Sequence, residues 1–225
     1  MTRLLDILLS GIALLVFLPF GVVIALILRF SGEGEVFYTQ ERIGKGGKRF
    51  GLLKFATMLK SSPSIGSRDI TVKNDPRVLP VGRFLRRTKL NEIPQLLNVV
   101  SGDMSIVGPR PQTPRNFEYF PPEYRDMITS MRPGLTGIGS IMFRDEESIV
   151  ANSGLPLEVC YREIIGPYKA ELENWYASRQ NLSTYVALIA FTAWVVLRPA
   201  SQIYRRAWPS LPPRPAGLDG AVEGT

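Results

Sequence analysis

Histidine does not occur in this chain of 225 residues, and Cys160 is its only cysteine. The missing imidazole removes the usual general base and the commonest metal ligand. A single thiol excludes an internal disulfide and is compatible with a reducing compartment. Proton transfer and nucleophilic attack are therefore left to carboxylates, lysines, tyrosines and the one thiol. A bound metal would be a hard cation held by oxygen and not zinc.

Charge is unbalanced in this chain, with 27 lysines and arginines against 20 acidic residues and a formal net charge of +7. Such a balance suits an anionic membrane face, nucleic acid or a phosphorylated substrate. A nucleic-acid binder is disfavoured because no helix-turn-helix, RNP or zinc pattern occurs and because cations alternate with acids. We therefore expect no nucleic-acid partner.

An almost wholly apolar segment covers residues 4–28, with Asp6 and Ser10 as polar exceptions. A helix of this length rises about 1.5 Å per residue and can cross a bilayer. Pro19 lies in its middle, where a proline removes a backbone hydrogen bond and kinks or breaks the helix. Two structures remain open: a kinked transmembrane helix, which is the commoner outcome, and a hairpin that dips into one leaflet and returns.

Three further segments have a clear local pattern. Residues 36–60 predict two strands around a basic turn at 45–48. Residues 182–197 form a second apolar block, which is shorter than the usual crossing of about 20 residues. We expect it to form an interfacial or shallowly inserted helix. Residues 199–225 are rich in proline, glycine and alanine, and this composition predicts a disordered tail.

The most charged stretch, residues 83–111, contains a short apolar run at 93–100 that predicts one buried helix. Asn91 and Glu92 come directly before this run, where unpaired N–H groups and the helix dipole favour a phosphate. Arginines on both sides can converge there and hold a diphosphate through their forked guanidinium groups. The alternative is a capped surface helix with solvated arginines, since clustered charge is usually surface.

Residues after this stretch predict structure more than chemistry. A helical run follows Pro121 and continues to Met131, and a glycine-containing turn with one arginine follows at 132–137. Such a turn is as often a plain surface turn as a phosphate contact. Aromatic and apolar side chains then recur at helical spacing and predict a core-facing stripe: Tyr168, Leu172, Trp175 and Tyr176.

Short motifs follow one another along the chain in a recognisable order. After a proline-interrupted apolar segment come Gln40-Glu41-Arg42-Ile43-Gly44, Leu53-Lys54-Phe55, Asp75-Pro76-Arg77 and Gly82-Arg83-Phe84-Leu85-Arg86. The later motifs are Leu90-Asn91-Glu92-Ile93-Pro94-Gln95, Gly102-Asp103-Met104-Ser105, Gly108-Pro109-Arg110-Pro111, Arg132-Pro133-Gly134 and Trp175-Tyr176. In these motifs the chain resembles the bacterial sugar transferase family, the monotopic polyprenyl-phosphate phosphoglycosyl transferases, over nearly the whole of residues 3–197.

The resemblance implies an α+β protein in four parts. Residues 1–30 would form a re-entrant membrane helix that breaks at Pro19, which reverses the preference for a crossing. Residues 31–181 would form a small globular catalytic domain of short helices with a β-hairpin. An interfacial helix at 182–198 and the tail at 199–225 would follow. The protein would lie in the bacterial cytoplasmic membrane, with its catalytic domain facing the cytoplasm.

The resemblance also implies a reaction. The family moves a sugar-1-phosphate from a nucleotide diphosphosugar, usually a UDP-sugar, to polyprenyl phosphate and releases UMP. This is the first membrane step of polysaccharide or glycoconjugate assembly, and it requires Mg²⁺. The expected partners are the donor, the lipid acceptor and the inner leaflet, with a homodimer left open.

Carried onto this chain, the family's catalytic positions are Asn91, Glu92 and Asp103. Glu92 and Asp103 would also hold the metal. Five cations would bind substrate: Lys54, Arg83, Arg86, Arg110 and Arg132.

The chain departs from the family at the aspartate that attacks the β-phosphate in relatives, which is Asn91 here. A carboxamide carries no negative charge, so it is a poor nucleophile and a weak ligand for Mg²⁺. Three explanations stay open. The chain is an active transferase that uses Glu92 or Asp103 as nucleophile or metal ligand; it transfers directly without a covalent intermediate; or it is a catalytically silent relative that binds substrate or partners.

Overall fold

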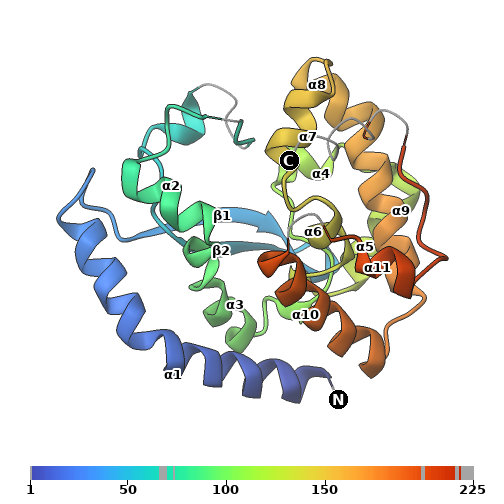
Figure 1. Cartoon of the computed structure of the whole chain (residues 1–225), viewed down its shortest axis with the longest axis horizontal. Coiled ribbons are helices and arrows are strands. Elements are labelled where there is room, and N and C mark those ends of the chain that lie inside the picture. The colour runs from blue at the N-terminus through green and yellow to red at the C-terminus, as the bar shows by residue number, and fades with distance from the viewer. Residues whose placement is uncertain (1, 66–69, 73, 199–200, 216–217, 219–225) are drawn as a thin grey trace.

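The computed structural model describes residues 2–65, 70–72, 74–198, 201–215 and 218 (Figure 1). One long N-terminal helix, α1 (Thr2–Arg29), lies along the side of a globular body. That body is built from short helices and, in its described part, two small sheets of two strands each. The predicted mixture of short helices with a β-hairpin is confirmed.

The hairpin is formed where the sequence predicted it. Strand β1 (Phe37–Ile43) pairs antiparallel with β2 (Arg49–Phe55), in a register that sets Phe37 opposite Phe55. The turn between them, η1 (Lys45–Gly47), has Gly46 and Gly47 at φ values of 69° and 71°. Glycine adopts these positive φ values without the steric cost that a side chain would impose.

The charged central stretch folds into four short elements. These are α2 (Pro80–Arg87), the single turn η3 (Leu90–Glu92), α3 (Gln95–Ser101) and β3 (Ser105–Val107). The predicted helix is confirmed in type but starts later, because Pro94 occupies the N-cap position. No side chain caps α3. Gly102 ends the helix at φ 100°.

A parallel strand pair joins the central stretch to the second half of the chain. Strand β3 pairs with β4 (Gly134–Thr136), with Ser105 opposite Gly134. Glycine is needed at Gly134 because a Cβ there would collide with the backbone nitrogen of Gly108. This close approach fixes the position of the loop that follows β3, and that loop carries Arg110.

Helices complete the core. They are α4 (Pro114–Phe117), α5 (Pro122–Ser130), α6 (Ile138–Met142), α7 (Glu146–Asn152), α8 (Leu157–Cys160), the π-helical turn η4 (Tyr161–Ile165) and α9 (Gly166–Ala177). The predicted stripe on α9 is confirmed, since its four aromatic and apolar side chains are all buried in the main hydrophobic cluster.

The C-terminal region contains α10 (Leu182–Leu197) and α11 (Ile203–Ala207). The predicted disorder is wrong for residues 201–215, because Tyr204 and Leu211 are buried in the main hydrophobic cluster. The Trp208 ring packs against the rings of Trp175 and Phe191, at centroid distances of 5.2 and 5.1 Å. The remaining tail residues, except Leu218, lie outside the described residues.

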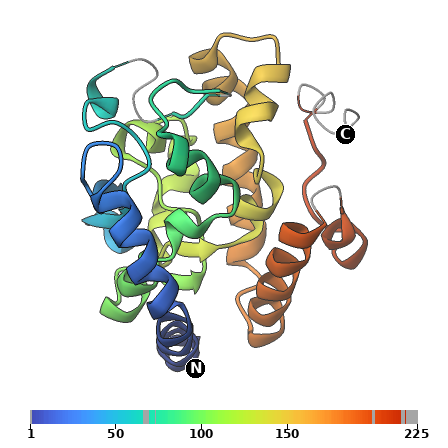
Figure 2. The same cartoon turned by 60° about the vertical axis from the view of Figure 1, so that its left-hand side comes forward.

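Helix α1 runs without interruption through Pro19 and bends near its middle (Figures 1 and 2). The helix therefore continues through Pro19, and the expected break at this proline is wrong. By length and composition α1 could cross a membrane. Most of its large apolar side chains are exposed.

Both ends of α1 contact the globular body. At the first end, Arg3 donates to the carbonyl oxygens of Val99 and Val100 at 2.6 and 2.9 Å. At the other end, Leu28 is buried with Phe55 and Leu85 in a separate cluster. The helix is therefore docked at its two ends and exposed between them.

Candidate active site

A partly buried ion pair lies at the centre of the charged stretch. Arg110 Nη2 lies 2.7 Å from Glu92 Oε1, and the two side chains are 33% and 15% exposed. Glu92 is placed by the turn η3, and Arg110 by the loop that β3 and Gly134 fix. The sequence separates these residues by 18 positions, and the fold brings their charges together as predicted.

The surroundings of this pair are strongly cationic. Burial alone would raise the pKa of Glu92, but attraction to Arg110, Lys54 and Lys89 outweighs it and holds that pKa far below its ordinary value. Burial and repulsion from Arg42 lower the pKa of Lys54 well below its ordinary value. The carboxylate of Glu92 is therefore ionised at any physiological pH, in a centre that favours additional negative charge.

Helix α7 supplies two carboxylates that the sequence analysis did not include. Glu147 Oε1 lies 3.1 Å from Nη2 of Arg86, which α2 carries. Glu146 Oε1 lies 2.6 Å from Nζ of Lys169, and it also hydrogen-bonds with Tyr161. The acidic run at 145–147 was the available signal. Its partners, however, lie far along the chain and local spacing does not reveal them.

A third missed carboxyl group, Glu173 of α9, supports the Arg110 loop from behind. The side chain is 3% exposed and accepts hydrogen bonds from the backbone N–H groups of Arg110 and Gly139. Burial raises its pKa to about 8, partly offset by Lys169 and these backbone groups. At neutral pH this group is therefore largely protonated, and it positions the loop without adding charge to the centre.

Asn91, at the position where the resemblance leads one to expect a catalytic aspartate, is buried at 5% exposure. Within the described part of the chain its Oδ1 atom has no hydrogen-bond partner. A buried amide oxygen without a partner costs free energy. The position therefore offers one neutral oxygen beside Glu92 and no nucleophile.

Three of the predicted site residues lie elsewhere. Asp103 is exposed and accepts a hydrogen bond from Ser101 Oγ at 2.8 Å. Arg132 is exposed and donates from Nε to the carbonyl oxygen of Gly102 at 3.1 Å. Both residues lie at the C-terminal end of α3, whereas Glu92 precedes its N-terminus. Arg83 is exposed on α2.

Helix α3, with seven residues and a length of about 10 Å, lies between the two predicted metal ligands, Glu92 and Asp103. The described residues contain no cluster of three or more acidic or cysteine side chains that could hold a metal.

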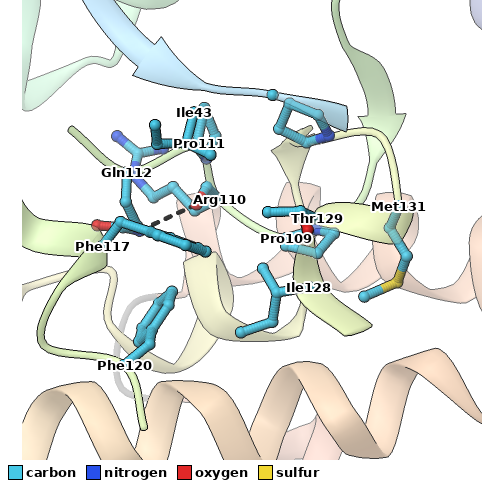
Figure 3. Close-up of a pocket in the computed structure, with 12 residues that line it drawn as sticks. Ile43, Pro109, Arg110, Pro111, Gln112, Phe117, Phe120, Ile128, Thr129 and Met131 are labelled. Atoms are coloured by element: carbon cyan, nitrogen blue, oxygen red, sulfur yellow. Dashed lines mark hydrogen bonds between the residues drawn. The ribbon is translucent and has the colours of Figure 1, made fainter. Parts of the chain in front are cut away.

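A small cavity lies on the other side of the Arg110 loop, between the hairpin and α5 (Figure 3). Phe117, Phe120 and Ile128 form its floor, and Gln112 Nε2 donates to the carbonyl oxygen of Arg110 at 2.9 Å. Its volume of about 20 Å³ holds about one water molecule. The cavity is therefore too small to receive a nucleotide-sugar.

The structure thus combines a long helix with exposed apolar side chains and a centre dominated by arginine and lysine. The chain belongs to the bacterial sugar transferase family, whose sequence model matches residues 1–199. This match confirms the resemblance and identifies the chain as a member of a family of sugar-transferring enzymes.

Similar proteins carry names that agree with this family. The chain is 38% identical to the exopolysaccharide production protein ExoY of Rhizobium meliloti over 64% of this chain and 69% of that protein. It is 43% identical to a putative undecaprenyl-phosphate N-acetylgalactosaminyl 1-phosphate transferase of Bacillus subtilis over 52% and 65% of the two chains. It is 32% identical to an undecaprenyl-phosphate galactose phosphotransferase of Salmonella typhimurium over 73% of this chain but only 34% of that longer protein.

Proposed function

We propose that this chain transfers a sugar-1-phosphate from a nucleotide diphosphosugar to polyprenyl phosphate at a membrane surface. The observation that carries the proposal is the Glu92–Arg110 pair inside a cationic centre to which Lys54, Lys89 and Arg86 also belong. Phosphoryl transfer depends mainly on positioning and on neutralising charge, so a site without histidine can perform it.

A UDP-sugar is the proposed donor. Two phosphates carry more negative charge than one, and a centre with several guanidinium and ammonium groups favours such a ligand. A relative from Erwinia amylovora, 28% identical over 85% of this chain, is named a UDP-galactose-lipid carrier transferase. The identity of the sugar is left to experiment.

Magnesium is the proposed cofactor, held through one carboxylate and the donor phosphates. Mg²⁺ commonly binds through one or two carboxylates together with substrate phosphates. Glu92 is the ionised carboxylate of the centre, and the Oδ1 atom of Asn91 is a buried oxygen without a partner among the described residues. A bound ion would neutralise charge on the diphosphate, while Arg110 orients Glu92.

A re-entrant α1 is the proposed membrane anchor. A straight helix of 28 residues is about 42 Å long, more than the roughly 30 Å hydrocarbon core. If α1 crossed the bilayer, its two ends would lie on opposite sides. Contacts of both Arg3 and Leu28 with one globular body support ends on the same side, which we propose to be the cytoplasmic one.

The test is release of UMP by the purified protein in detergent, with undecaprenyl phosphate, Mg²⁺ and a panel of UDP-sugars. We expect UMP from at least one donor, dependent on the lipid and on Mg²⁺. Replacing Arg110 with alanine should lower the rate by about 10²-fold or more, because the charged centre loses its principal guanidinium. No UMP from any donor would favour the catalytically silent alternative.

A further inference from the structure

We propose that Glu147 is the nucleophile of this enzyme and attacks the β-phosphorus of the donor in place of the aspartate missing at position 91. The inference rests on the proposed transfer reaction. It starts from the ion pair between Glu147 and Arg86, which brings a carboxylate of α7 into the charged centre.

Accessibility distinguishes Glu147 from the other carboxylates of this centre. Its side chain is 42% exposed, and Arg86 engages only its Oε1 atom. A nucleophile needs a solvent-reachable oxygen, and the exposed side chain of Glu147 provides one.

The remaining carboxyl groups of the centre are less accessible. Glu92, paired with Arg110, is 15% exposed, and Glu146, paired with Lys169, is 23% exposed. Glu173 is buried behind the Arg110 loop. Glu147 is therefore the carboxylate of this centre that a donor phosphate in solution reaches most readily.

Arg86 can hold both reacting groups. Its Nη2 atom binds Glu147, while Nη1 points to the Sδ atom of Met58 at 3.7 Å, a weak acceptor that a phosphate oxygen can replace. A guanidinium shared between a carboxylate and a phosphate places them side by side. The same arginine thus binds the donor and holds the attacking oxygen near it.

Helix α7 holds Glu147 in place. Asp145 caps the helix by accepting a hydrogen bond from the backbone nitrogen of Ser148 at 3.2 Å. Ile149 is buried in the main cluster, and Glu146 is tied to Lys169. The backbone that carries the nucleophile is therefore anchored on both sides of it.

The chemistry balances without a further reactant. An ionised oxygen of Glu147 bonds to the β-phosphorus, and the bond from this phosphorus to the oxygen that bridges it to the α-phosphorus breaks. The bridging oxygen keeps the electron pair and leaves as part of UMP, so no proton is transferred. The resulting acyl phosphate carries the sugar. An oxygen of polyprenyl phosphate then attacks the same phosphorus, and the carboxylate of Glu147 is released.

The experiment maps the covalent intermediate. The full chain is incubated with Mg²⁺ and a UDP-sugar that supports UMP release, but without lipid, and then digested and analysed by mass spectrometry. We expect one sugar-phosphate adduct on the peptide that contains Glu147, which hydroxylamine removes. An adduct on any other residue would overturn the proposal. So would UMP release that occurs only with lipid present and leaves no adduct.

Two substitutions complete the test. Glu147→Gln should abolish the adduct and lower kcat by about 10³-fold or more, with the KM for the donor changed only a few-fold. Glu41→Gln is the matched control, because Glu41 is exposed and pairs with Arg49 at 3.0 Å on the hairpin. It should leave both readouts unchanged.

The experiments distinguish failure of the proposed function from failure of the proposed nucleophile. If the unmodified chain releases no UMP, the proposed function fails and the nucleophile fails with it. If it releases UMP and Glu147→Gln retains the rate, only the nucleophile is wrong. A lower KM in that variant would mean that Glu147 merely competes with the donor for Arg86. If Glu147→Gln does not fold, adduct mapping on the unmodified chain decides.

Discussion

The Tyr185 hydroxyl donates to Oδ1 of Asp6 at 2.8 Å and so joins α10 to the first turns of α1, across 179 positions. The same carboxylate, 1% exposed, accepts from Ser105 Oγ and from the backbone nitrogen of Ile106. Asp6, a polar residue inside the apolar segment, therefore links α1 to the globular body.

Removing the Asp6 carboxylate should weaken the contact between α1 and the globular body. Asp6→Ala leaves three buried donors without an acceptor and should lower the free energy of unfolding by about 3 kcal/mol or more. Asp6→Asn keeps one carbonyl oxygen and should cost less. Thermal unfolding of the detergent-solubilised variants measures both, and an unchanged Tm for Asp6→Ala would contradict the role of Asp6.

Glu92 and Asp103, which the sequence made equivalent candidates, should differ in their effect on rate. Glu92→Gln should lower kcat by about 10²-fold or more, because it removes the charged partner of Arg110 from the centre. Asp103→Asn should change the rate less than threefold, since Asp103 lies at the far end of α3. Rates of UMP release compare the two, and equal losses would contradict this separation.

Glu173 should make stability depend on pH. The folded pKa of about 8 lies above the ordinary value of 4.5, so the folded state binds the proton more tightly than the unfolded state. This contribution to stability is complete below pH 4.5 and is lost as pH rises through about 8. Glu173→Gln should remove that dependence, which unfolding curves at pH 6 and pH 8.5 would reveal. Parallel curves for both proteins would contradict it.

The topology of α1 can be read by labelling. Cys160 is fully buried, so an impermeant reagent should not reach its thiol in the folded chain. Single cysteines introduced at Thr2 and Ser31 should then react with an impermeant maleimide from the same side of a sealed vesicle. Reaction from opposite sides would end the re-entrant proposal and establish a crossing.

The sequence predicted those features that local pattern determines. The glycine turn gave the hairpin, and helical spacing gave the buried face of α9. Strands β3 and β4 were missed because three residues are too few to show a period. The tail was misjudged because composition suggested disorder, whereas Trp208 finds two aromatic partners only in the folded chain.

Within the site, the sequence predicted that Glu92 and Arg110 lie together, but it also placed Asp103 and Arg132 in the same site. The chain turns at Gly102, and β3 then leads away from the far end of α3 towards the Arg110 loop. Glu92 and Asp103, which are close in sequence, thus lie at opposite ends of one helix. Glu147 was missed because its partner, Arg86, lies 61 positions away, and no local spacing encodes such a pair.

The most direct test of the central claim follows the β-phosphate itself. A UDP-sugar labelled with radioactive phosphorus at the β-position is incubated with the protein, Mg²⁺ and undecaprenyl phosphate, and the mixture is extracted with organic solvent. Transfer of a sugar-1-phosphate predicts that the label moves into the lipid phase while unlabelled UMP remains in water. A label that stays in the aqueous phase as UDP, with or without transfer of the sugar, would contradict the account.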